Sequence, residues 1–286
     1  MEKAKIGIIG GSGLYNMAEL TRKKTIKIKT PFGTPSEVFL SGFLSGREVV
    51  FLARHGKNHS LLPGELNHRA NVWAMKKLGV AWIVSVSAVG SLQAKYPPRS
   101  IVFPDQFFDR TKEKHHTFFG EGIVAHVGFS DPASVLTQQI LADGAGNAGA
   151  AFHMGGTYVN MEGPSFSTRA ESLYYQRNKF DIIGMTNMAE AKLAREAEIA
   201  YAPMCFVTDY DCWHLSEEPV TADIVLANLR ANAEQAGKIL AAALPNFPLV
   251  ADEECHNALS VALVTPKTHW PAKTVRKLKP ILQKYL

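Results

Sequence analysis

Residues 200–213 read AYAPMCFV followed by TDYDCW, an apolar run that leads into two aspartates. An apolar run of this length is typical of a buried strand. If the extended geometry continues, Asp209 and Asp211 point to the same side and aim two acids into one pocket. Asp-x-Asp after a strand is also a common turn sequence, but a solvated turn has no use for the large rings of Tyr210 and Trp213. We therefore interpret this stretch as one wall of a binding site.

Other predicted strands also end in glycine-rich or polar residues. Residues 5–9 precede Gly10-Gly11-Ser12-Gly13, residues 48–53 lead into Arg54-His55, and residues 80–87 end at Ser87-Ala88. Helical patterns alternate with the strands and are expected at residues 61–78, 134–147, 170–178, 191–197, 222–244 and 271–286. This alternation predicts an α/β fold in a single domain over residues 1–286, with a central mixed β-sheet flanked by helices and a site along one edge.

The groups at these strand ends suit a phosphate ion. Arg54 offers a guanidinium fork, the glycine turn offers directed backbone N–H groups, and Ser87 offers a hydroxyl. The third glycine of the dinucleotide fingerprint is missing, because position 16 is Asn, and no Walker lysine motif occurs. Free phosphate without Mg²⁺ therefore fits better than a dinucleotide or ATP. From the residues alone, a solvated rim remains an equal alternative for the basic loop 54–59.

Composition and charge are those of an ordinary globular chain, with 46% hydrophobic and 20% charged residues. The formal net charge is +5, but residues 267–286 hold six of the 31 basic residues and no acid. The positive charge is thus concentrated in a basic C-terminal tail, which argues against a nucleic-acid-binding body. The three cysteines have no metal-site spacing and predict reduced thiols. Without an apolar span or a signal-peptide pattern, we expect a cytoplasmic protein that does not bind membranes.

Seven ordered motifs lie between Ile6 and about Leu240: GSGLY at 11–15, RHG at 54–56, SAVGSL at 87–92, DQFFDRT at 105–111, EGPSFSTRAES at 162–172, MTNMAE at 185–190 and TDYDCW at 208–213. Together they resemble the nucleoside phosphorylase family, and within it the trimeric class that acts on 5′-methylthioadenosine. Beyond Pro245 the likeness becomes loose.

The resemblance implies a role for each matching position. Phosphate would be held by Ser12, Arg54, His55, Ser87, Ala88 and Thr186. The base would face Phe166 and Ser167, the ribose would lie against Met185, and the purine edge would meet Asp209 and Asp211. The 5′ group would be enclosed by Val220, Ala222, Val225 and Leu226, with His126 from a neighbouring subunit of a homotrimer. From the sequence alone, plain core packing is an equal alternative for this apolar helix face.

The implied reaction is phosphorolysis of 5′-methylthioadenosine to adenine and 5-methylthioribose 1-phosphate. An oxocarbenium-like transition state puts positive charge on the sugar and negative charge on the departing purine, so an acid at N7 stabilises the leaving group. Asp209 is the predicted acid, with Asp211 tuning or sharing that contact. The proton comes either from a pKa of Asp209 raised by burial and by Asp211, or from the substrate itself; both options stay open.

Adenine is the expected base, because it presents a donor at N6 and an acceptor at N1, the reverse of a 6-oxopurine. A carboxylate at Asp209 and a hydroxyl at Ser167 suit that polarity, whereas the resemblance implies Asn and Glu at these positions in oxopurine enzymes. A broader purine nucleoside phosphorylase acting on adenosine or inosine is the alternative. A module that binds nucleotides or RNA through the basic tail is a second one. We expect no cofactor and no metal, with phosphate as a substrate and no nucleic acid as a partner.

Overall fold

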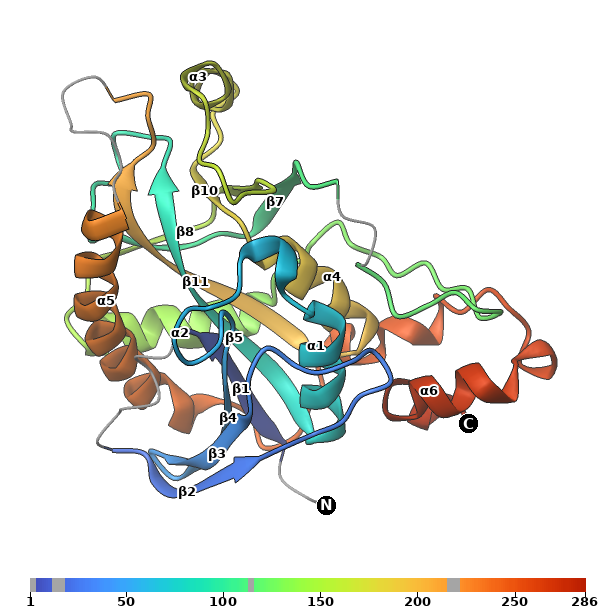
Figure 1. Cartoon of the computed structure of the whole chain (residues 1–286). Helices are drawn as coiled ribbons and strands as arrows, with labels where there is room; N and C mark the ends of the chain where they lie inside the picture. The colour runs from blue at the N-terminus through green and yellow to red at the C-terminus, as the bar shows by residue number, and fades with distance from the viewer. Residues whose placement is uncertain (1–3, 12–18, 113–115, 215–221) are drawn as a thin grey trace.

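The computed structural model describes residues 4–11, 19–112, 116–214 and 222–286, with only the backbone described for residues 222–231 (Figure 1). The strands are β1 (Lys5–Gly10), β2 (Thr21–Ile26), β3 (Phe39–Leu44), β4 (Arg47–Ala53), β5 (Val80–Ser91), β6 (Ile101–Phe103), β7 (Gln106–Asp109), β8 (Phe152–Met154), β9 (Thr157–Asn160), β10 (Ile182–Gly184) and β11 (Ala200–Tyr210). The α-helices are α1 (His68–Lys77), α2 (Val135–Asn147), α3 (Arg169–Arg177), α4 (Asn187–Glu196), α5 (Ala222–Ala243) and α6 (Ala272–Leu282). The predicted α/β class with a central mixed sheet flanked by helices is confirmed.

Strand β5 is the centre of the sheet. The main path of the sheet is β2-β3-β4-β1-β5-β10-β9-β7, while β11 pairs with β5 and β6, and β8 pairs with β6. Strand β1 runs parallel to β4 and β5, and β11 runs parallel to β5 from Ala200 opposite Trp82 to Tyr210 opposite Ser91. The carboxyl ends of these four parallel strands therefore meet at one edge of the sheet, as the pattern of polar strand ends predicted.

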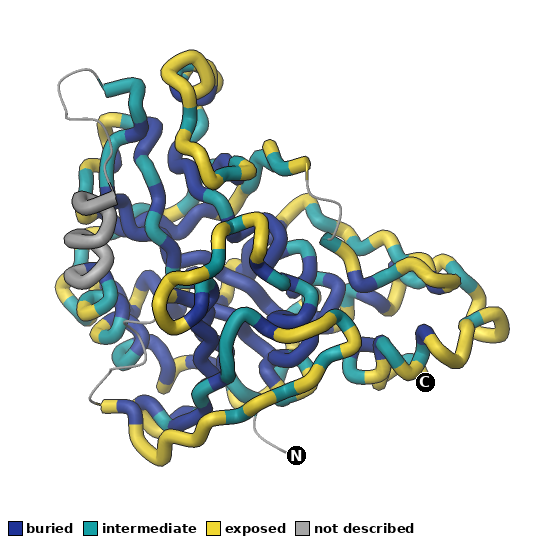
Figure 2. The backbone as a smooth tube through the Cα atoms, viewed as in Figure 1, coloured by how far each residue is buried: buried dark blue, intermediate teal, exposed yellow. Residues whose placement is uncertain are grey.

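Apolar side chains cover both faces of the sheet, whose central strands are buried (Figure 2). On one face, α2 and α5 bury Leu141, Ile239 and other apolar side chains against the strands, together with Trp82 and Phe206. These helices approach closely at Gly144, where a Cβ atom would lie 2.7 Å from the Cβ of Ala243. On the other face, α1, α4 and α6 form the second layer. Helices therefore cover both faces of the sheet, as the apolar strands and amphipathic helices of the sequence predicted.

Helix boundaries differ from the prediction at two places that matter for the site. The helix expected over 61–78 begins only at His68, because the side chain of Asn67 accepts a hydrogen bond from Ala70 N at 3.1 Å and caps it. The helix expected at 191–197 begins at Asn187, so Asn187 and Glu190 belong to its first turn. Its N-cap residue is Thr186, whose side chain makes no capping hydrogen bond.

The basic residues 267–286 are a docked part of the fold. In α6, Leu278, Ile281 and Leu282 are buried in the apolar layer shared with α1 and α4. The indole of Trp73 in α1 donates a hydrogen bond to the carbonyl of Lys277 at 3.0 Å, and the hydroxyl of Tyr285 donates to Glu198 at 2.5 Å. The segment that the sequence left without a role therefore covers one face of the protein.

Candidate active site

A cleft with a cavity volume of about 350 Å³ lies where the parallel strands end. Nine of the predicted site residues line it: Arg54, His55, Ser87, Ala88, Phe166, Met185, Thr186, Asp209 and Asp211. They come from the ends of β4, β5, β10 and β11 and from the loop before α3. The tertiary structure thus brings together residues that are up to 157 positions apart in the chain, as in other sheets whose ligands bind at the carboxyl ends of the strands.

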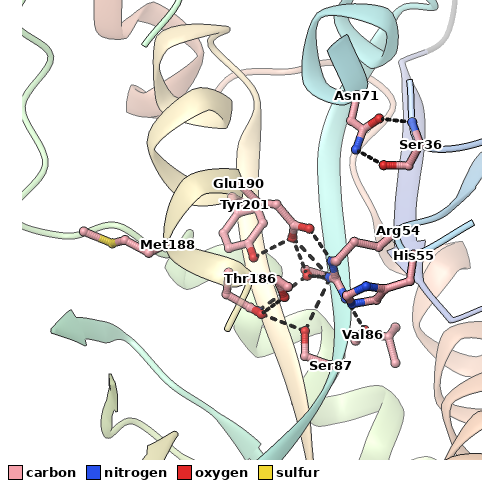
Figure 3. Close-up of polar contacts among 12 residues, drawn as sticks. Ser36, Arg54, His55, Asn71, Val86, Ser87, Thr186, Met188, Glu190 and Tyr201 are labelled. Atoms are coloured by element: carbon pink, nitrogen blue, oxygen red, sulfur yellow. Dashed lines mark hydrogen bonds and ion pairs between the residues drawn. The ribbon is translucent and has the colours of Figure 1, made fainter. Parts of the chain in front are cut away.

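Arg54 follows β4 directly and is only 4% exposed. Its guanidinium donates to both carboxylate oxygens of Glu190, from Nε to Oε1 at 2.5 Å and from Nη2 to Oε2 at 3.2 Å (Figure 3). Nη2 also donates to Ser85 Oγ at 2.5 Å. This forked pairing holds the arginine in one orientation, with part of its surface in the cleft.

Glu190 is the functional residue that sequence reasoning missed. It lies in the first turn of α4 and is 1% exposed. Besides the bonds from Arg54, its Oε2 accepts hydrogen bonds from Ser85 Oγ at 2.7 Å and from the hydroxyl of Tyr201 at 3.1 Å. Burial by itself would raise the pKa of Glu190, but the charge and hydrogen bonds of Arg54 hold it below its usual value. The sequence does show a serine, Ser85, inside the apolar run 80–87 and a glutamate, Glu190, in the motif 185–190. Their role becomes clear only when the structure shows that both bind Arg54.

Hydroxyl groups occupy the cleft beside Arg54. Ser87 Oγ and Thr186 Oγ1 lie 2.8 Å and 3.2 Å from Oδ1 of the buried Asn187, which orients both. Thr186 is also the N-cap residue of α4, so the positive end of that helix lies at the cleft. Both hydroxyls donate to Asn187, so the groups of this cluster that suit a phosphate ion as donors are the Arg54 guanidinium and the N-terminus of α4.

His55 stands next to Arg54 and lines the same end of the cleft. Its Nδ1 lies 2.8 Å from the carbonyl oxygen of Leu61, and its ring stacks on that of His59 with centroids 4.4 Å apart. Burial, and next to it the charge of Arg54, lower the pKa of His55 to about 4. The imidazole is therefore neutral at physiological pH. His59, which the prediction did not include, also lines the cleft.

Asp209 and Asp211 form the other end of the cleft. The register of β11 against β5 shifts between Val207 and Asp209, so Thr208 is an extra residue in a β-bulge that re-aims the strand end. Thr208 Oγ1 donates to Asp209 Oδ2 at 2.6 Å. Asp211 is 5% exposed, and burial raises the pKa of its carboxyl group. Both acids line the same cleft, as their predicted same-side placement requires.

The remaining predicted residues lie elsewhere. Ser167 does not line the cleft but lies behind it, where its side chain hydrogen-bonds to Asp211 and its carbonyl accepts from Cys212 Sγ at 3.4 Å. His126 is exposed on a ribbon where its N–H donates to Ala262 O at 2.9 Å, away from the cleft of its own chain. Ser12 and Val220 fall outside the described residues, and for Ala222, Val225 and Leu226 only their place on α5 is described.

Comparison with known proteins places this geometry in a family. Residues 5–245 match the model of the Phosphorylase superfamily. The chain belongs to that superfamily. It is 52% identical over 283 residues to the S-methyl-5′-thioadenosine phosphorylase of Koribacter versatilis, covering 99% of this chain and 97% of that protein.

Two solved structures of phosphorylases share the fold. A methylthioadenosine phosphorylase sourced from an antarctic soil metagenomic library has a TM-score of 0.93 and 49% identity, covering 99% of this chain and all of that chain. The methylthioadenosine phosphorylase of Schistosoma mansoni in complex with adenine has a TM-score of 0.80 and 38% identity, covering 85% of this chain and 91% of that chain. None of the helices in the described part of the chain combines the length and the apolar composition of a membrane span.

One group of potential metal ligands occurs in the described part of this phosphorylase-superfamily chain, formed by Glu253, Cys255 and His256. The side chains of Glu253 and His256 are engaged in hydrogen bonds within the protein. His256 Nδ1 accepts from the backbone N–H of Glu253 at 3.0 Å, and Nε2 lies 2.9 Å from Ala81 O. The carboxylate of Glu253 accepts from Trp82 Nε1 at 2.8 Å. Glu253 and His256 thus form a capping box at the start of the short 3-10 helix Glu254–Ser260.

Proposed function

We propose that this chain catalyses the phosphorolysis of 5′-methylthioadenosine to adenine and 5-methylthioribose 1-phosphate. One observation carries the proposal: a single cleft unites Arg54 and Thr186, suited to phosphate, with the acids Asp209 and Asp211. The high identity to S-methyl-5′-thioadenosine phosphorylases over nearly the whole chain supports the same substrate. We further propose that the reaction needs no cofactor and that it serves purine and methionine salvage.

In the proposed reaction, a phosphate oxygen held near Arg54 attacks C1′ of the nucleoside while the bond from C1′ to N9 breaks. The electron pair of that bond moves into the purine, which takes a proton at N7 from Asp209. Phosphate oxygens stabilise the positive charge on the sugar, and the acid neutralises the negative charge on the base. Met185 and Phe166 would contact the ribose and the base, and Ser12 and Ala88 would complete the phosphate site.

The test of this function is adenine release from 5′-methylthioadenosine with and without phosphate, compared with adenosine and inosine. We expect release that depends on phosphate and is fastest for 5′-methylthioadenosine. Adenosine is the relevant competitor, because a Schistosoma mansoni relative with 36% identity is described as an adenosine/methylthioadenosine phosphorylase. Faster cleavage of inosine would contradict the assignment, and equal rates without phosphate would indicate a hydrolase.

We also propose a cytoplasmic homotrimer in which His126 of one subunit completes the 5′ pocket of the next, beside Val220, Ala222, Val225 and Leu226. His126 lies on a ribbon, paired through Ala125 and Leu263, that exposes Val124, Val261 and Val264 at 42%, 94% and 61%. An exposed apolar group of this kind favours a protein interface. Sedimentation should give three times the 31.3 kDa chain mass. A monomer with full activity would contradict the proposed assembly.

A further inference from the structure

The ribbon that carries His126, residues 117–128, lies beside the C-terminal segment of the chain, residues 262–286 (Figure 1). Val124 N donates a hydrogen bond to Thr265 Oγ1 at 2.9 Å. The N–H of His126 itself donates to a carbonyl oxygen of the same segment at 2.9 Å. The residue that the proposed assembly presents to a neighbouring subunit is therefore held by the end of its own chain.

Helix α4 fixes only the two ends of the ribbon. Glu196 accepts a hydrogen bond from Phe118 N at 2.7 Å, and Arg195 Nη1 donates to Gly128 O at 2.6 Å. Between these two points, the hydrogen bonds that join the ribbon to other parts of the described chain all go to the C-terminal segment. This segment therefore decides where the middle of the ribbon lies.

The turn of the ribbon, residues 120–123, is fastened to the first turns of α6. The hydroxyl of Thr274, a residue that is 3% exposed, donates to Glu121 O at 2.7 Å. Ile123 is buried in the apolar layer to which α6 belongs. The ion pair of Lys277 with the carboxylate of Glu121 is partly exposed and adds little. A buried hydrogen bond and apolar packing thus hold this turn against the helix.

Gly122 brings the turn into direct contact with Pro271, the N-cap residue of α6. Its φ is +94°, a conformation that favours glycine, and a Cβ atom at this position would lie 2.5 Å from Cγ of Pro271. The chain can approach the proline ring this closely only because Gly122 has no side chain. The place of the ribbon is therefore set by the start of α6.

We propose that the start of α6 positions the ribbon so that His126 reaches the 5′ pocket of the neighbouring subunit. Pro271 and Thr274 are the positioning residues, and through them the C-terminal segment sets the preference for a 5′-methylthio group over a 5′-hydroxyl group. The inference rests on the proposed function, in which His126 completes that pocket. A methylthio group gains from a wall that keeps water out, whereas the hydroxyl group of adenosine keeps its hydrogen bonds when water enters.

The variant Gly122→Ala tests this inference, because the added methyl group would collide with Pro271 and push the turn away from α6. The ratio of kcat/KM for 5′-methylthioadenosine to kcat/KM for adenosine should fall by about tenfold, the low end of what one apolar group in a pocket contributes. The KM for phosphate should change by less than about threefold, because the phosphate end of the cleft is built from other elements. An unchanged ratio would overturn the inference.

Gly120→Ala is the matched control for backbone strain. Gly120 has a φ of +120°, also in the region that favours glycine, but no other described atom lies within 4 Å of its Cβ position. The ratio for this variant should stay within about twofold of that of the unmodified protein. An equal fall in both variants would mean that strain, and not the contact with α6, changes selectivity, and would overturn the inference.

The double variant Gly122→Ala/Pro271→Ala should restore the ratio. It removes Cγ and Cδ of the proline and leaves Cβ, which lies 3.9 Å from the added methyl position, at ordinary contact distance. A loss that came only from a weakened fold would not be repaired by a second substitution on the neighbouring segment. If the ratio stays low in the double variant, Pro271 does not position the ribbon.

Hydrogen exchange of the ribbon amides separates this inference from the proposed function, because it needs no turnover. In Gly122→Ala the amides of Val124 and His126 should exchange at least about tenfold faster than in the unmodified protein, and in the double variant at the original rate. If the unmodified protein cleaved neither nucleoside, the proposed function would fail, whereas faster exchange would still show that α6 holds the ribbon. Unchanged exchange in Gly122→Ala would contradict that hold.

Discussion

Replacing Asp209 with Asn is expected to lower kcat for 5′-methylthioadenosine by roughly 10²- to 10⁴-fold, the usual contribution of a general acid. Asn keeps the size of the side chain and can still accept a hydrogen bond from Thr208 Oγ1, which lies 2.6 Å from Asp209 Oδ2. The change therefore removes the proton donor and leaves the cleft intact. The measurement is steady-state adenine release at saturating phosphate.

A substrate with a cationic base distinguishes acid catalysis from a structural effect. A 7-methyl derivative of the nucleoside already carries positive charge on the purine and leaves without protonation at N7. Asp209→Asn should cleave this derivative at nearly the rate of the unmodified protein. Cys212→Ser is the control in the same loop, because a serine hydroxyl can replace the thiol that donates to Ser167 O. It should change kcat by only about threefold or less. Equal losses in the two variants would refute Asp209 as the acid.

The role of the neighbouring acid follows from its burial. Asp211 is 5% exposed, and burial raises its pKa while the side chains of Ser172 and Ser167, which hydrogen-bond to it, lower it in part. Asp211 lines the cleft beside Asp209. This division of labour fits Asp209 as the proton donor and Asp211 as a contact to the base.

Replacing Glu190 with Gln is expected to destabilise the protein by about 3 kcal/mol in phosphate-free buffer. The change removes one partner of a buried ion pair and leaves the charge of Arg54, 4% exposed, without a counter-charge. Phosphate would then be the available counter-charge, so saturating phosphate should raise the melting temperature of the variant by more than that of the unmodified protein. Thermal unfolding with and without phosphate measures both effects.

The surface pair of Lys277 and Glu121 is the matched control for this prediction. Its separation is 2.7 Å, close to that of the buried pair, but the glutamate side chain is 57% exposed. Glu121→Gln should therefore change the melting temperature little and should leave the effect of phosphate unaltered. If the loss in Glu190→Gln is the same with and without phosphate, Glu190 supports the fold and does not position Arg54 for an anion.

Much of the site could be predicted because its residues lie at the ends of strands that the sequence marks clearly. The apolar runs before Arg54, Ser87 and Asp209 are long enough to identify as strands, and parallel strands must bring their carboxyl ends together. The short strands β7 and β8 were missed, since their sequences QFFD and FHM contain no run of aliphatic residues. The first residues of helices α1 and α4 were predicted at the wrong positions, because local sequence signals define helix boundaries only to within a few residues.

By itself, the sequence determined the α/β class, the family and most of the residues that meet in the cleft. These follow from the apolar period of each element and from ordered motifs, which are local properties of the chain. Only the tertiary structure decided that Glu190 pairs with Arg54, that Thr208 forms a bulge behind Asp209, and that Pro271 meets Gly122. The physical reason is that burial and hydrogen-bond partners belong to contacts between distant segments, and these contacts decide both charge and orientation.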